Sequence, residues 1–164
     1  MSTVIFYEGT TNHKHNDIVK IGSNCIIGTN VVLGSDGFGY NDDLTHKEHK
    51  FGVILEDNVI IHPLVNIARG SWRDTVIGEG TRIDSFAHIA HNVIIGKNCL
   101  IGAGAMILGS VQIGDNTKIW SNSTINQRTK IGSNVIIGAN TYIRHDVSDN
   151  ELWYGNPAKK IRMV

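Results

Sequence analysis

Isoleucine recurs at every sixth position through the second half of this chain. Twelve positions spaced by six, from Ile77 to Ile143, all carry it, and the residue two places earlier is always small or β-branched. Neither a helix period of 3.6 residues nor a strand period of 2 sustains that spacing alone. Stacked coils do, because each hexad forms one short strand and one turn and packs its isoleucine on those of neighbouring coils. The sequence therefore predicts an all-β fold, a parallel β-helix of hexapeptide repeats.

The N-terminal part keeps the same rhythm in another phase, with Ile21-Gly22, Ile27-Gly28 and Leu33-Gly34. Two polar, glycine-containing stretches interrupt it, residues 36–52 and 68–74, and the first is expected to be a loop expelled from the coils. Long loops in a compact solenoid are usually functional or disordered. We expect a single domain over residues 1–164 that ends in a short C-terminal tail, residues 149–164.

Bulk composition excludes several classes of partner. Lys plus Arg and Asp plus Glu each number 15, so no strong field favours nucleic acid or an anionic membrane surface. No apolar run approaches the ~18 residues of a membrane span, and residues 1–19 lack the apolar core of a secretory signal. We expect a cytoplasmic protein without stable membrane insertion. Cys25 and Cys99 occupy the small-residue positions and are predicted to fill the core.

The stretch "HIAHNV", residues 88–93, carries two imidazoles three residues apart. His91 is the third residue of the hexad that begins at Ile89, away from both core positions, so its side chain should point out of the coil. Imidazole exchanges a proton near neutral pH, which suits a catalytic base. A packed structural histidine is the alternative for both residues. Metal binding by His88 and His91 alone is disfavoured, because the stretch is predicted to form a strand and a corner of the coil and supplies no third ligand.

The Ile-Gly hexads resemble those of the hexapeptide-repeat acyltransferases over about residues 17–148. "GSDGFGY" (34–40), "DTVIG" (74–78) and "IAHNVIIG" (89–96) are most similar to the UDP-3-O-acylglucosamine N-acyltransferases of lipid A synthesis. The resemblance implies a left-handed parallel β-helix with three hexads per coil, assembled as a homotrimer.

Two departures from the lipid A enzymes shift the expected donor. The chain has no room for their N-terminal uridine-binding domain or their C-terminal helical region, and its ending "WYGNPAKKIR" (153–162) resembles acetyl-CoA-dependent sugar acetyltransferases. We therefore expect an acyltransferase that moves an acyl group, acetyl first, from acyl-CoA to the amine of a nucleotide-linked amino sugar for surface polysaccharide or lipopolysaccharide. The alternative within the family is a lipid A type N-acyltransferase with a long-chain 3-hydroxyacyl donor.

The resemblance also assigns roles at the paired histidines. His91 matches the general base of the family and His88 a second histidine near the acceptor. Asn92 stands where the related O-acyltransferases have Asp, and it matches the N-acyltransferases. With three hexads per coil, Gly109 lies one coil beyond His91, and its N–H would stabilise the oxyanion of the tetrahedral intermediate. A turn glycine that serves only the corner is the alternative.

Further binding residues follow from stacking and from the insertions. The acceptor is expected to meet residues of the two insertions: Asp36, Phe38, Tyr40 and Arg69. The coenzyme is expected to meet residues on later coils and in the tail: Asn126, Gln127, Arg144, Lys159 and Lys160. His46 and His49 lie in a charged run and are predicted to be solvated.

A different class of function uses the same fold. A scaffold, or a zinc trimer like a carbonic anhydrase, needs no acyl donor, and His62, His88 and His91 could supply three imidazoles at a subunit interface. The "HIAHN" context and the "GNPAK" tail favour the acyltransferase, which requires no metal.

Overall fold

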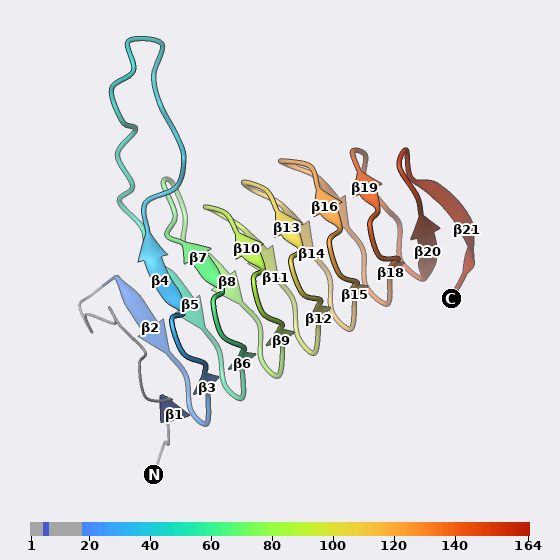
Figure 1. Ribbon diagram of the computed structural model, residues 1–164, viewed down its shortest axis with the longest axis horizontal. Coiled ribbons are helices and arrows are strands. Elements are labelled where there is room, and N and C mark those ends of the chain that lie inside the picture. Colours follow the sequence, from blue (N-terminus) through green and yellow to red (C-terminus); the bar gives the residue numbers. More distant parts are fainter. Residues whose placement is uncertain (1–4, 7–17) are drawn as a thin grey trace.

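The chain forms a three-sided parallel β-helix with coil stacked on coil, as the computed structural model shows (Figure 1). The structure describes residues 5–6 and 18–164. The excluded secretory signal concerns residues 1–19, most of which lie outside the described residues. No helix in the described part of the chain is long and apolar enough to cross a membrane.

Three sheets form the three sides of the solenoid, and their strands pair in parallel except for the last pair, β20 with β21. The first sheet contains β1 (Ile5–Phe6), β3 (Ile26–Ile27), β6 (Ile60–Ile61), β9 (Arg82–Ile83), β12 (Leu100–Ile101), β15 (Lys118–Ile119), β18 (Ile136–Ile137), β20 (Glu151–Tyr154) and β21 (Lys159–Met163). The second contains β4 (Val32–Ser35), β7 (Asn66–Ala68), β10 (His88–Ile89), β13 (Met106–Ile107), β16 (Thr124–Ile125) and β19 (Tyr142–Ile143). The third contains β2 (Val19–Ile21), β5 (Val53–Leu55), β8 (Thr75–Ile77), β11 (Ile94–Ile95), β14 (Gln112–Ile113) and β17 (Lys130–Ile131).

The isoleucines stack along the inside of each sheet. Ile89 pairs with Ile107 and Ile107 with Ile125, so one coil is three hexads, or eighteen residues, as expected. All twelve isoleucines of the unbroken series are at most 3% exposed. Their close stacking fills the narrow interior with branched aliphatic carbon, which is the main source of stability in this fold.

The small residues before the isoleucines also lie inside. Thr81 donates a hydrogen bond to the carbonyl of Gly96 at 2.8 Å and accepts one from the backbone N–H of Cys99 at 3.0 Å, so its hydroxyl is satisfied at the corner. Cys25 and Cys99 are fully buried, which confirms them as core residues. Burial raises the pKa of the Cys99 thiol to about 11, so its reactive thiolate is suppressed.

Both insertions emerge at the same corner, between the second and third sheets. The 36–52 loop joins β4 to β5 and projects as the long arm in Figure 1, while residues 69–74 join β7 to β8 one coil further on. The expelled loop is therefore confirmed, but its two ends fold back onto the corner. The C-terminal tail closes the solenoid through β20 and β21, where Lys160 pairs with the carboxylate of Glu151 at 2.5 Å.

Replacing Ile101 with Ala should lower the free energy of unfolding by ~2–5 kcal/mol, because the deletion leaves a cavity in a filled core. Its neighbour Leu100 lies half-buried on the outer face of β12 and provides a matched control. Leu100→Ala should cost clearly less. Urea denaturation of the two variants at one protein concentration measures the difference, and equal costs would mean that the isoleucine series is not the core.

Candidate active site

The corner between the second and third sheets brings together residues spaced by one coil. The backbone N–H of Ser110 donates to the carbonyl of His91 at 2.9 Å, and that of Arg128 donates to the carbonyl of Gly109 at 2.9 Å. His91, Gly109 and Gln127 consequently occupy equivalent positions on three successive coils. The predicted stacking of Gly109 next to His91 is correct.

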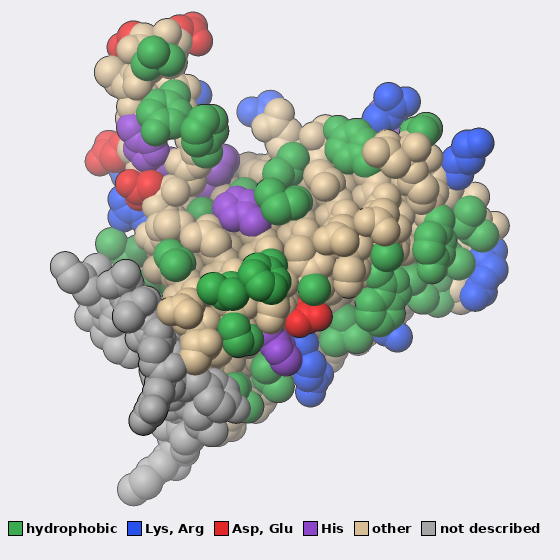
Figure 2. Space-filling model, in the orientation of Figure 1, with side chains coloured by type: hydrophobic (Ala, Val, Ile, Leu, Met, Phe, Trp, Pro, Cys, Tyr) green, Lys and Arg blue, Asp and Glu red, His purple; other side chains and the backbone are tan. Residues whose placement is uncertain are grey.

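A groove of about 550 Å³ runs along this corner. Its lining combines the stacked corner residues with parts of both insertions: Lys47, Ser71, Trp72, Arg73, His91, Asn92, Gly109, Ser110, Gln112, Gln127 and Arg128. Three of these side chains are cationic and none is a carboxylate, so the groove attracts anionic ligands. Figure 2 shows histidine side chains gathered where the 36–52 loop meets the coils.

The half-buried ring of His91 lies directly against Gly109. A Cβ atom added to Gly109 would sit 2.8 Å from Cε1 and 2.9 Å from Nε2 of this ring. Any larger residue at this position would therefore clash with the imidazole. The Gly109 backbone N–H donates no hydrogen bond within the described part of the chain. A free N–H beside an imidazole in a groove is a suitable donor for a developing oxyanion.

The neighbouring Asn92 is completely buried and fixed by the second insertion. Its side-chain oxygen accepts hydrogen bonds from the backbone N–H groups of Ser71 at 2.8 Å and Trp72 at 3.2 Å. Its amide nitrogen lies 2.7 Å from Nδ1 of His91. Arg73 also anchors this residue, because its guanidinium donates two hydrogen bonds to the backbone carbonyl of Asn92, at 3.0 and 2.8 Å.

The 36–52 loop places a second imidazole beside His91. His49 is 4% exposed, and its ring meets that of His91 edge-on with a centroid distance of 5.7 Å. Its Nε2 accepts a hydrogen bond from the Gly37 N–H at 3.2 Å. The prediction that His49 is solvated is wrong, because the loop folds back and buries it against the corner. His46 is exposed, as predicted.

Burial and neighbouring rings lower the pKa values of both histidines in "HIAHNV". Burial is the main cause for His91, followed by repulsion from the imidazoles of His49 and His88. Burial alone lowers the pKa of His88. Both rings are therefore biased toward the neutral form at neutral pH.

His88 lies on the outer face of β10, between Asn66 and Met106 of the adjacent strands, and does not line the groove. His62 lies on a different corner, 4.0 Å from Asp84. Within one chain, the three histidines of the zinc alternative therefore do not converge.

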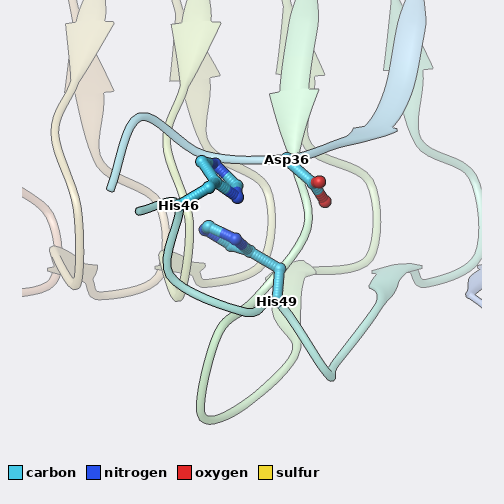
Figure 3. Close-up of side chains that lie close together, drawn as sticks. All are labelled: Asp36, His46 and His49. Carbon is cyan, nitrogen blue, oxygen red and sulfur yellow. The ribbon is translucent and has the colours of Figure 1, made fainter. Parts of the chain in front are cut away.

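Within the described residues, Asp36, His46 and His49 form the one group of three side chains that could together hold a metal ion, with candidate ligand atoms within 4.8 Å of one another (Figure 3). Asp36 is already paired with Arg69, however, at 2.6 Å.

The predicted acceptor residues lie around the 36–52 loop. The ion pair joins Asp36 and Arg69, two of these residues, to each other. Phe38 is 92% exposed and meets Tyr40 edge-on at a centroid distance of 5.2 Å. These four residues border the corner but do not line the groove itself.

The residues predicted to bind the coenzyme do not lie together in the structure. Gln127 lines the groove with His91, whereas Arg144 lines a separate small hollow against the C-terminal tail. Asn126 lies half-buried and lines neither of them. Lys160 is bound to the carboxylate of Glu151, and Lys159 is exposed on β21. The structure thus brings only Gln127 of this set to the candidate site.

Sequence reasoning missed the groove roles of Lys47, Arg73 and Arg128. Arg128 follows Gln127 and could have been found by counting whole coils from His91. Lys47 and Arg73 reach the groove only through the folded paths of the two insertions, for which the hexad rhythm gives no register.

Comparisons with known proteins place this geometry in a family. A model of the bacterial transferase hexapeptide (six repeats) matches residues 74–109, 96–127 and 110–145, and one of the hexapeptide repeat of succinyl-transferase matches residues 18–35. The chain belongs to the hexapeptide-repeat transferase family.

Two relatives are similar to the chain in sequence. A UDP-3-O-acylglucosamine N-acyltransferase of Azorhizobium caulinodans is 50% identical over 145 residues, which cover 87% of this chain and 41% of the relative. A probable mitochondrial UDP-3-O-acylglucosamine N-acyltransferase of Arabidopsis thaliana is 43% identical over 84 residues, 49% of this chain and 28% of the relative. The chain spans less than half the length of these curated relatives.

Solved structures share the fold. The UDP-N-acetylglucosamine acyltransferase of Bacteroides fragilis superposes with a TM-score of 0.80 at 22% identity, over 99% of this chain and 60% of that one. The Arabidopsis UDP-N-acetylglucosamine acyltransferase gives 0.78 at 24% identity, over 88% and 58%. The predicted left-handed parallel β-helix is confirmed.

Stability should fall as the pH is lowered from about 7.5 to 5.5, because the unfolded chain binds protons at His88 and His91 that the folded chain resists. The lowered folded pKa values place this loss below the ordinary histidine pKa of about 6.5. A variant with both residues changed to Gln should lose less stability over the same range. Urea denaturation at fixed protein concentration measures the free energy of unfolding at each pH. His145→Gln, a change at an exposed histidine, is the control. If the double variant and the wild type lose stability with the same pH slope, the prediction is wrong.

Proposed function

We propose that this chain is the catalytic β-helix of an acyltransferase that moves an acyl group from a thioester to the amine of a UDP-linked glucosamine. The observation that carries the proposal is His91 packed on Gly109 in a cationic groove, in a chain 50% identical to a UDP-3-O-acylglucosamine N-acyltransferase. An anionic nucleotide sugar suits the charge of this groove.

The reaction needs few protein groups. The neutral acceptor amine attacks the thioester carbonyl, the C–N bond forms, and negative charge develops on the carbonyl oxygen. The Gly109 N–H donates to this oxyanion, a contribution typically worth about 3 kcal/mol of barrier. When the intermediate collapses, the C–S bond breaks, and the amine proton ends on the departing thiolate. Two roles for His91 stay open as predictions: a general base for the amine proton, or a residue that only positions the amine while the proton passes to the departing thiolate.

We propose that residues lining the groove contact the substrates. Lys47, Arg73 and Arg128 supply positive charge for phosphate groups of the nucleotide or the donor's pantetheine arm. The 58% exposed indole of Trp72, with the Arg73 guanidinium 4.6 Å from its centre, offers an aromatic face.

The relatives favour the lipid A alternative over acetyl transfer. Their names specify N-acylation of UDP-3-O-acylglucosamine, whereas the expectation of acetyl-CoA came from the "GNPAK" tail. We therefore place a long-chain hydroxyacyl thioester first and acetyl-CoA second as the donor, in the cytoplasm and without a required metal.

A donor screen tests the function directly. Purified protein is incubated with UDP-glucosamine or its 3-O-acyl derivative and with acetyl-CoA, longer acyl-CoAs or hydroxyacyl thioesters on acyl carrier protein, and thiol release and amide formation are measured. Acylation with none of these donors would overturn the proposal. Protein with zinc bound and carbon dioxide hydration activity would support the zinc alternative instead.

His91→Ala should lower kcat about 10²–10⁴-fold, the usual contribution of positioned proton transfer. His88→Ala should instead raise the KM for the acceptor more than it lowers kcat, because the family resemblance gives His88 a contact with the acceptor, whereas its place outside the groove keeps it from the reacting atoms. Steady-state kinetics with thermal melts of both variants separates these results from a structural role, in which both variants melt earlier but keep turnover per folded molecule.

A homotrimer is expected, because the groove lies open along one corner and a neighbouring chain in a cyclic assembly would close it. Sedimentation equilibrium at micromolar concentration should give three times the chain mass of 18.0 kDa. A monomer under these conditions would contradict both the assembly and a shared site.

A further inference from the structure

We propose that Asn92 is a positioning residue that holds the proton of neutral His91 on Nε2, so that the site selects amines over hydroxyl groups as acceptors. This inference deepens the proposed function and rests on it for the acceptor. It concerns one hydrogen bond, between the side-chain amide of Asn92 and Nδ1 of His91.

The orientation of the Asn92 amide is fixed by its other partners. The backbone N–H groups of Ser71 and Trp72 can only donate, so the atom that they meet at 2.8 and 3.2 Å must be the side-chain oxygen. The amide nitrogen is then the atom that faces His91 at 2.7 Å. Because Asn92 is completely buried, water cannot replace these partners.

The tautomer of His91 follows from this orientation. An amide nitrogen donates and does not accept, so Nδ1 must offer its lone pair, and the neutral ring carries its hydrogen on Nε2. Nε2 is also the ring nitrogen that lies against Gly109. The ring therefore presents an N–H group beside the free backbone N–H of Gly109.

The surroundings also disfavour the doubly protonated ring. An imidazolium would direct an Nδ1–H at the Asn92 amide hydrogens. The titratable and charged groups around the ring are His49 from the 36–52 loop, His88 on β10, and the groove cations Lys47, Arg73 and Arg128; the lining contains no carboxylate. Burial and the two imidazoles lower the pKa of His91 in the same direction.

This protonation state suits one class of nucleophile. A neutral amine attacks with its own lone pair and needs no base beforehand, so an Nε2–H is free to donate to the oxyanion or to the departing sulfur. A hydroxyl group must lose its proton as it attacks, and Nε2 cannot accept that proton while it carries a hydrogen. The proton released from the amine passes to the thiolate, which leaves as thiol.

The first test observes the tautomer without any reaction. Long-range proton–nitrogen NMR of histidine-labelled protein at neutral pH, assigned by loss of the signal in His91→Gln, should show a protonated Nε2 and an unprotonated Nδ1. In Asn92→Asp the carboxylate keeps an acceptor for the Ser71 and Trp72 N–H groups but now accepts from Nδ1–H, so the pattern should invert. Asn140→Asp is the matched control, because both asparagines adopt positive φ at corners (61° and 55°), and its spectrum should equal that of wild type.

The second test compares UDP-glucosamine with UDP-glucose, which replaces the acceptor amine by a hydroxyl group. The ratio of kcat/KM for amine over hydroxyl should fall at least about tenfold in Asn92→Asp, and Asn140→Asp should keep the wild-type ratio. The variant's hydroxyl transfer should also rise with pH through a new ionisation, that of a His91 whose pKa the carboxylate raises.

The results of the two tests distinguish a failure of the inference about Asn92 from a failure of the proposed acyltransferase function. An Nδ1-protonated His91 in the wild type, or an unchanged acceptor ratio in Asn92→Asp despite an inverted tautomer, overturns this inference. An Nε2-protonated ring in a protein that acylates neither acceptor with any thioester overturns the proposed function and, with it, the acceptor selection, while the hydrogen bond to Asn92 stands.

Discussion

Isoleucine stacks on isoleucine at eighteen-residue intervals, and this packing sets the register of the coils. Three short strands per coil bury one branched side chain each, and parallel pairing to the coils on either side fixes their register. A one-residue slip would turn these side chains outward. Because the register is rigid, residues outside the core also align from coil to coil, and this alignment places His91, Gly109 and Gln127 on one corner.

The corner becomes a site because both insertions leave the coils there. A bare β-helix corner is a convex edge with little concavity. The segment 69–74 anchors Asn92 through Ser71 and Trp72, and the 36–52 loop folds His49 against His91. The insertions thus supply walls, the cations Lys47 and Arg73, and the hydrogen bonds that orient the Asn92 amide toward His91, whereas the coils supply the position of the central imidazole.

Sequence reasoning located the centre of the site better than its periphery. The pair His91 and Gly109 follows from the hexad spacing once the family resemblance supplies three hexads per coil, because rigid stacking converts sequence distance into spatial distance. Lys160 was expected at the coenzyme, but the tail folds back so that Glu151 binds it, and a hairpin contact of this kind has no periodic signal. His49 looks solvated in a charged run, and only the return path of the loop buries it.

Periodicity in the amino-acid sequence is enough to predict the all-β solenoid and its buried isoleucines and cysteines, because a repeat of fixed length carries the same local pattern along the chain. The three-hexad coil, and with it the stacked pair His91 and Gly109, follows from the resemblance to the hexapeptide-repeat acyltransferases. Only the folded chain shows the paths of the two insertions, the pairing of Asp36 with Arg69, and the orientation of the Asn92 amide toward His91. These contacts join residues whose spacing follows no repeat, so their geometry depends on how each loop packs against the finished solenoid.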